Sequence, residues 1–102
     1  MGISEREKLV LNAIVDYYLT VGDTIGSRTL VKKYGIELSS ATIRNVMADL
    51  EDMGFIEKTH TSSGRIPTDM GYKYYLTELL KVEKITQEEI ENISNVYNRR
   101  VD

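Results

Sequence analysis

The stretch that decides the fold is residues 39–75, SSATIRNVMADLEDMGFIEKTHTSSGRIPTDMGYKYY. Its first part repeats apolar side chains at helical spacing, with Ile43, Met47 and Leu50 on one face. Ser39 or Ser40 is suited to cap this helix, because a serine hydroxyl accepts a hydrogen bond from a backbone amide of the first turn. The pattern predicts a helix that ends near Gly54 and packs on a core through its apolar stripe.

The opposite face of this helix is divided along its length. The first half is small, polar or cationic and the second half is acidic, with Asp49, Glu51 and Asp52. The residues of the first half are Ala41, Thr42, Arg44, Asn45 and Ala48. A helix that is merely solvated has no need of this division, whereas a helix that inserts only its N-terminal end into an anionic groove does. We therefore interpret the first half as a nucleic-acid contact.

A hairpin follows the helix. Residues 55–59 and 65–68 are two short extended segments, and Ser62, Ser63 and Gly64 between them supply turn chemistry. Pro67 lacks an amide donor, so we place it at a strand end or edge. Arg65 is expected at the tip of this hairpin.

Thr68 can cap a closing helix that follows the hairpin. Its inner stripe is expected to hold four apolar side chains, while Lys73 and Tyr74 point elsewhere. These four are Tyr72, Tyr75, Leu76 and Leu79. Further on, Thr86 and Glu89 have capping-box spacing and predict a separate fifth helix.

Two helices precede the quoted stretch. Ser4 and Glu7 form a capping box, and apolar residues recur at helical spacing until Gly22. Ser27 is expected to cap a second, shorter helix that stops at Gly35.

Helix, short helix, tight turn, helix, hairpin and closing helix is the order of a winged helix-turn-helix domain. We expect a mainly α (α+β) fold with a three-helix core, a two-stranded wing and a closing helix. In this architecture the third helix enters the DNA major groove and the wing lies on the backbone or minor groove. Arg44 and Asn45 can read guanine and adenine edges. The candidate DNA-binding residues are Ser27, Arg28, Ser39, Ser40, Ala41, Thr42, Arg44, Asn45, Lys58, His60, Thr61, Ser62, Ser63, Gly64 and Arg65.

The composition is compatible with this interpretation. The 102 residues suffice for one domain, and the formal net charge of −3 hides two acid-free windows, residues 38–48 and 58–68. The chain has no cysteine and one histidine, so we expect no cofactor and no metal site. No apolar run is long enough for a membrane span, which favours a cytoplasmic protein.

The segments SSATIRN (39–45), HTSSGRIPTDMGYKYY (60–75) and VGDTIGSRTLVKKY (21–34) resemble the N-terminal domain of the HrcA family of heat-inducible transcription repressors, over roughly residues 5–80. The resemblance implies a bacterial heat-shock repressor that binds double-stranded DNA at an inverted-repeat operator as a homodimer. It also implies that the chaperonin GroE is a partner that helps to keep the repressor active.

The chain departs from the family pattern at three positions. Val46 stands where an acid is usual, Thr24 where proline is frequent, and Met70 where a polar residue is common. We expect Val46 to alter a contact at the edge of the recognition helix. Family members also continue beyond residue 102, so we interpret residues 1–82 as the DNA-binding domain. Residues 83–102 are then a helical tail or the start of a linker to a dimerisation and regulatory region.

The sequence also offers alternatives to DNA binding. His60 beside Ser62 and Ser63 suggests a base and a nucleophile, but no nearby acid would orient the ring, so we expect no enzyme. A winged helix can instead serve protein contact, here through the tail stripe and the tyrosines. RNA binding is a minor further alternative. Absence of a salt-dependent affinity for DNA would favour protein contact.

Overall fold

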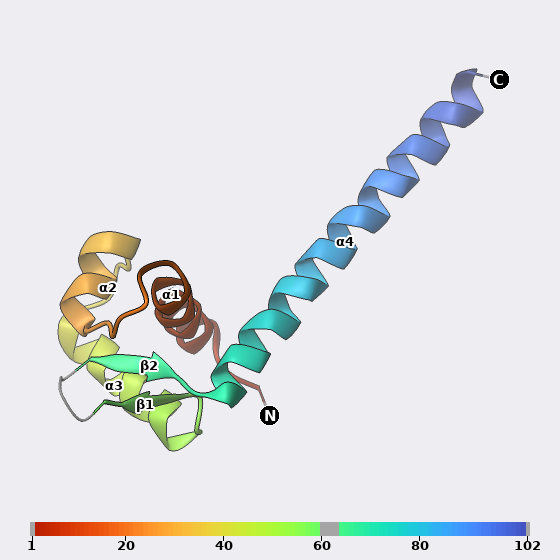
Figure 1. The fold of residues 1–102 in the computed structure, drawn as a ribbon. Helices are drawn as coiled ribbons and strands as arrows, with labels where there is room; N and C mark the ends of the chain where they lie inside the picture. The colour runs from red at the N-terminus through yellow and green to blue at the C-terminus, as the bar shows by residue number, and fades with distance from the viewer. Residues whose placement is uncertain (1, 60–63, 102) are drawn as a thin grey trace.

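The computed structural model describes residues 2–59 and 64–101, and it confirms a winged helix-turn-helix fold (Figure 1). Three helices form the core, a two-stranded antiparallel sheet forms the wing, and a fourth helix follows. The elements are α1 (Glu5–Val21), α2 (Ser27–Tyr34), α3 (Ser40–Asp52), β1 (Ile56–Lys58), β2 (Arg65–Pro67) and α4 (Asp69–Val101).

Helix α1 begins and ends where the sequence predicts. The Ser4 amide donates to Glu7 Oε1 at 2.8 Å, and the Glu7 amide donates to Ser4 Oγ at 3.1 Å, which completes the capping box. At the other end Gly22 adopts φ 80°, a left-handed conformation that glycine takes at low cost. The first helix is thus delimited by local signals.

Helix α2 begins one residue earlier than predicted. Gly26 is the N-cap and Ser27 is already the first helical residue, so the expected Ser27 cap is wrong. The preceding residue Ile25 is held extended by two backbone hydrogen bonds to Arg65, of 3.2 and 3.0 Å. We attribute the early start to this extended segment, because it leaves Gly26 as the position where the chain turns into the helix.

The core lies between α1, α2 and α3. Ile14, Leu30, Ile43 and Leu50 are completely buried there, as the apolar stripes predicted. Val46 joins them with only 6% of its surface exposed. Its side chain therefore packs in the core, and the expected effect of the missing acid on a contact at the edge of the recognition helix stays a prediction.

The wing is the predicted hairpin, with Ile56 opposite Pro67 and Lys58 opposite Arg65. Pro67 ends β2, where its missing amide costs no ladder hydrogen bond. On the other edge of β2, Ile25 forms an isolated antiparallel bridge with Arg65. The start of β2 is thereby attached to the segment between α1 and α2.

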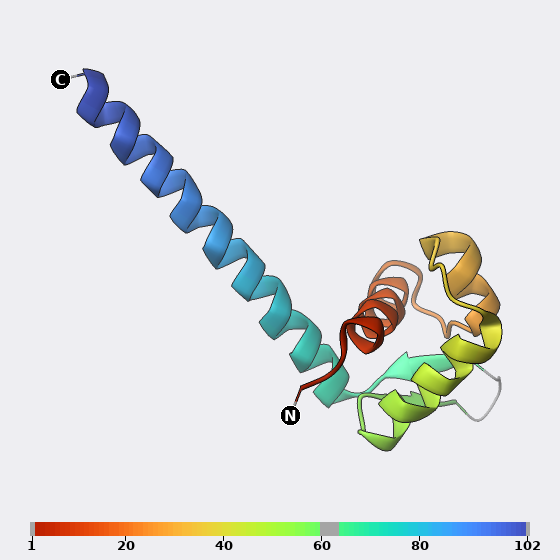
Figure 2. The same ribbon diagram turned by 180° about the vertical axis from the view of Figure 1, so that it is seen from behind.

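Helix α4 runs unbroken for 33 residues, so the separate fifth helix predicted at Thr86 is wrong. Capping-box spacing does not end a helix by itself, and no glycine or proline interrupts the sequence between Tyr72 and Val101. The far part of α4 projects away from the domain in both views (Figures 1 and 2). The predicted boundary between residues 82 and 83 falls within this helix and stays a prediction.

The inner face of α4 differs from the predicted stripe. Tyr74 packs on Phe55 with ring centroids 5.4 Å apart, and Tyr75 is half-buried beside the core, whereas Tyr72 is exposed. Gly71 is buried and lies against the Phe55 carbonyl, which fixes the rotation of the helix. Leu76 and Leu79 are consequently exposed, and the prediction that Tyr74 points elsewhere is wrong.

One turn beyond Tyr74, Glu78 reaches α1. Its carboxylate lies 3.7 Å from Lys8 Nζ, and this charge raises the pKa of the Lys8 ammonium. The residues of α4 that face the domain are therefore Gly71, Tyr74, Tyr75 and Glu78, which recur at helical spacing.

Candidate nucleic-acid interface

The N-terminus of α3 is capped by Ser39. Its Oγ accepts from the Thr42 amide at 3.1 Å, and its hydroxyl donates to Thr42 Oγ1 at 2.8 Å. Ser40 and Ala41 in the first turn are exposed. The N-terminus of α3 therefore exposes the positive end of the helix dipole and small side chains to solvent. A phosphate can approach the backbone amides there closely.

The exposed face of α3 is the one that the sequence predicted. Arg44, Asn45 and Ala48 are exposed, while Ile43 and Met47 hold the helix to the core. Arg44 and Asn45 therefore stand in the first half of the helix with their side chains accessible. They have the donors and acceptors needed to recognise base edges.

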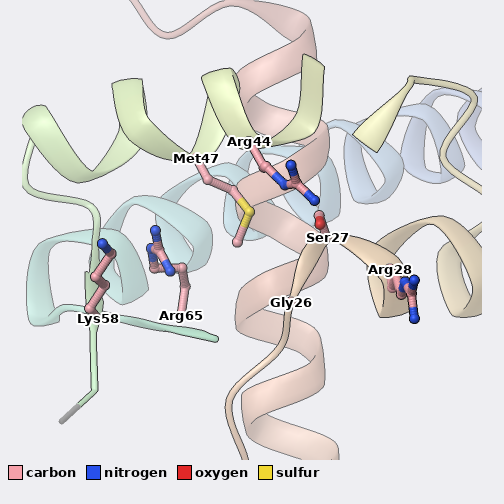
Figure 3. A pocket seen from close by; sticks show the side chains of 7 residues that line it. All are labelled: Gly26, Ser27, Arg28, Arg44, Met47, Lys58 and Arg65. Carbon is pink, nitrogen blue, oxygen red and sulfur yellow. The ribbon is translucent and has the colours of Figure 1, made fainter. Parts of the chain in front are cut away.

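A cleft of about 690 Å³ lies between the start of α2, α3 and the wing (Figure 3). The side chains of Arg44 and Met47 point into it from α3, while those of Lys58 and Arg65 extend side by side from the two strands of the wing. The lining residues are Gly26, Ser27, Arg28, Arg44, Met47, Lys58 and Arg65. Four basic side chains from four different elements are thus brought to one cleft, although the whole chain is acidic. A phosphate would be attracted there by their summed charge.

Arg65 lies in β2, opposite Lys58 at the loop-side end of the two-stranded ladder, and not at the tip of the wing, so that part of the prediction is wrong. Its side chain is only 16% exposed, and its Nε donates to Glu51 Oε1 at 2.8 Å. Strand pairing with Lys58 and the bridge to Ile25 hold its backbone in place.

Gly64 was predicted to form the turn of the hairpin with Ser62 and Ser63, and this turn stays a prediction because both serines lie outside the described residues. Among the described glycines only Gly22, Gly35 and Gly54 have positive φ, and Gly64 is buried against Thr24. Its small size permits this close approach of β2 to the α1–α2 segment. The predicted contacts His60, Thr61, Ser62 and Ser63 lie outside the described residues.

Helix α2 is fixed to α1 by polar contacts. Tyr34 Oη donates to Asp16 Oδ2 at 2.8 Å, and burial together with this bond raises the pKa of Tyr34 to about 12. Lys33 Nζ lies 4.9 Å from the centre of the Tyr17 ring, a cation–π contact. These contacts fix the position of α2, whose residues Ser27 and Arg28 line the cleft.

Two residues of the site were missed in the sequence. Met47 was assigned to the core alone, yet it also lines the cleft, and Glu51 was seen only as part of the acidic half of the helix. The two are four residues apart and so share a face of α3, a spacing that could have placed Glu51 beside the cleft. Its partner Arg65, however, comes from the hairpin, and no local pattern pairs them.

Residues 2–59 and 64–101 contain no cluster of three or more histidine, cysteine or acidic side chains that could hold a metal ion. None of the helices in these ranges combines the length and the apolar character that crossing a membrane requires.

No family model matches the chain. Curated proteins named heat-inducible transcription repressor HrcA are similar to it: the protein of Desulforudis audaxviator is 50% identical over 99% of this chain, and that of Acetivibrio thermocellus is 45% identical over 100%. The chain spans 29% of the length of each of these two relatives. The HrcA protein of Geobacter sulfurreducens is 50% identical over 93% of this chain and 28% of its own length.

A solved structure has the same fold. It is the crystal structure of a hypothetical protein at 2.2 Å resolution, with a TM-score of 0.77 and 43% identity over 81% of this chain and 26% of that chain. At this identity the likeness extends to sequence as well as fold. Over essentially its whole length the chain therefore matches the N-terminal domain of the HrcA repressors, and the resemblance found in its sequence is confirmed.

Proposed function

We propose that the chain is the sequence-specific DNA-binding domain of a heat-inducible transcription repressor. The observation that carries the proposal is the juxtaposition of the exposed face of α3 with the basic cleft at the wing. In this arrangement α3 enters the major groove by its N-terminal half, and the wing follows the backbone or the adjacent minor groove. Support from outside the chain comes from the names of its HrcA relatives.

Contacts to the DNA backbone are proposed for two parts of the protein. The first is the N-terminus of α3 at Ser39 and Ser40, and the second is the cleft with Arg28, Lys58 and Arg65. Each phosphate neutralised by a cation releases counterions, so about three such contacts would give log K against log salt a slope of about −3. The overall charge of −3 does not oppose this, because local charge governs contact within a Debye length of about 10 Å.

Base recognition falls to Arg44 and Asn45. An arginine can donate two hydrogen bonds to guanine O6 and N7, and an asparagine can pair with adenine N6 and N7. Both side chains are exposed one turn into α3, where a helix end reaches the floor of a major groove. These two residues are the proposed source of discrimination between sequences.

The wider function is proposed for the whole protein, of which the chain matches a part. Two copies on an inverted repeat would each place one α3 in successive turns of the major groove. Repression then requires only occupancy of the operator in the cytoplasm, so no catalysis is involved. Regulation through the chaperonin GroE is supported by the family resemblance alone.

Arg44→Ala tests the proposed base contact. A preferred duplex is first selected from a random pool with the wild-type chain, and binding is measured by fluorescence anisotropy on that duplex and a scrambled one. We expect a loss of about 1–3 kcal/mol on the selected duplex and a smaller loss on the scrambled duplex, with discrimination relaxed at one base pair. Equal losses on both would exclude base recognition by Arg44.

The matched control is Arg6→Ala. Arg6 is an exposed arginine near the start of α1, and it does not line the cleft. Its removal changes the net charge equally, so both duplexes should bind almost as they do to the wild type at about 0.15 M salt.

Protein contact remains the alternative function, and exposed apolar side chains on α4 favour it. Leu80 is 62% exposed and Ile93 is 69% exposed. Such side chains along a projecting helix suit a docking face for another protein. A wild-type chain without salt-dependent affinity for DNA would support this alternative over the proposal.

A further inference from the structure

A charged contact joins the recognition helix to the wing. Glu51 is in the last turn of α3, and its carboxylate accepts from Arg65 Nε at the start of β2 at 2.8 Å. The two residues are 14 positions apart in the chain and belong to different elements of the proposed interface. The contact therefore fixes how the start of β2 stands against the helix that carries Arg44.

The contact sets the direction in which the guanidinium group of Arg65 points. The backbone of Arg65 is already held by Lys58 on one side and by Ile25 on the other, so its remaining freedom lies in the side chain. That side chain is 16% exposed and that of Glu51 is 36% exposed. Partial removal from water strengthens a charge-assisted hydrogen bond of this length. Glu51 therefore draws the guanidinium toward α3 along the wall of the cleft.

Glu51 also changes the charge at the interface. Four cations line the cleft, and Glu51 is an acid in direct contact with one of them. An acid near the path of phosphates weakens binding to every sequence alike, since this attraction does not depend on the bases. Correct alignment of wing and helix, by contrast, benefits only a duplex whose bases fit Arg44 and Asn45.

We infer that Glu51 is a positioning and specificity-determining residue, which aligns the wing with α3 through Arg65 and lowers sequence-independent affinity. The inference rests on the proposed DNA-binding function. It assigns a role in recognition to the acidic half of α3, which itself presents no donor to the bases. The quantity that it governs is the ratio of affinities for a selected and a scrambled duplex.

Two substitutions separate alignment from charge. Glu51→Asp keeps the charge but shortens the side chain by one methylene, so it loses the contact with Arg65. Glu51→Gln keeps the length and one acceptor but removes the charge. The control is Asp52→Asn, which removes the same charge at the neighbouring, exposed position outside the Glu51–Arg65 contact.

The full chain of each variant is titrated with the selected and the scrambled duplex at two salt concentrations, after circular dichroism has shown a folded protein. For Glu51→Asp we expect affinity for the selected duplex to fall roughly three- to tenfold with the scrambled duplex unchanged. For Glu51→Gln we expect affinity for the scrambled duplex to rise roughly two- to fivefold without an equal rise for the selected one. Asp52→Asn should leave the ratio at its wild-type value.

The outcomes separate the two proposals. A wild-type chain that discriminates between the duplexes, with an unchanged ratio in both Glu51 variants, would overturn the role of Glu51 and leave the DNA-binding function standing. A ratio lowered equally by Asp52→Asn would reduce the effect to general charge and overturn it as well. A wild-type chain with no salt-dependent affinity for either duplex would remove the proposed function and the inference together.

Discussion

Gly71→Ala tests how α4 is attached to the wing. Gly71 lies in the first turn of α4, and a Cβ at this position would overlap the carbonyl oxygen of Phe55. The same carbonyl accepts from the Thr68 amide at 3.0 Å. Thr68 Oγ1 in turn donates to the Gly54 carbonyl at 2.5 Å and accepts from the Gly71 amide at 3.2 Å. A methyl group at residue 71 therefore enters a closely bonded junction.

The magnitude follows from two opposing effects. Alanine in place of glycine inside an open helix would stabilise the protein by about 1 kcal/mol. Here the backbone of Phe55 or the start of α4 has to shift, and overpacking with a weakened Thr68–Phe55 bond costs about 3 kcal/mol. The net loss is about 2 kcal/mol, which for a domain of this size lowers Tm by about 8–16 °C.

The assay is urea and thermal unfolding followed by far-UV circular dichroism. Gly26→Ala is the matched control, because a Cβ at residue 26 meets nothing within 4 Å and φ is −104°. The control should change the free energy of unfolding by less than about 1 kcal/mol, because the lower entropy of the unfolded alanine chain is offset by the weaker preference of alanine for the N-cap. If Gly71→Ala were as stable as the wild type, the close approach of α4 to Phe55 would not exist as described.

Two further predictions concern local hydrogen bonds. Ser39→Ala removes the acceptor for the Thr42 amide and should cost about 1 kcal/mol in urea unfolding, whereas Ser40→Ala at the first helical position should cost clearly less; equal losses would refute the cap. Tyr34 has a pKa of about 12 in the folded chain against about 10 in the unfolded chain. The stabilisation that its neutral phenol contributes, relative to Tyr34→Phe, is therefore complete below about pH 10 and declines toward pH 12. The difference in unfolding free energy between wild type and Tyr34→Phe should shrink from about pH 8 to about pH 11.5, and a constant difference would contradict the raised pKa that burial and the bond to Asp16 give Tyr34.

Much of the fold follows from signals that lie within a few residues. The capping box at Ser4, the glycine at residue 22 and the apolar stripe through Ile43 and Leu50 define α1 and α3 in sequence and structure alike. These features depend on neighbouring backbone groups and on helical periodicity, so they can be recognised without knowledge of the rest of the chain. The split face of α3 is predictable for the same reason.

The predictions that were wrong concern positions whose conformation depends on more than the neighbouring residues. Thr86 carries a capping signal, but a helix that meets no breaker continues through it. The N-cap of α2 moved to Gly26 because Ile25 is bonded to Arg65, 40 positions away in the sequence numbering. Tyr74 replaced Tyr72 on the inner face because Gly71 sets the rotation of α4 against Phe55.

The sequence by itself determined the order of the elements, the buried stripe of α3 and the exposed Arg44 and Asn45, since these are consequences of periodicity and capping. Only the tertiary structure decided that Arg28, Arg44, Lys58 and Arg65 meet in one cleft and that Glu51 holds one of them. The physical reason is that electrostatic contacts act over a few ångströms in space. Their partners come from separate elements, and packing of the core alone brings these together.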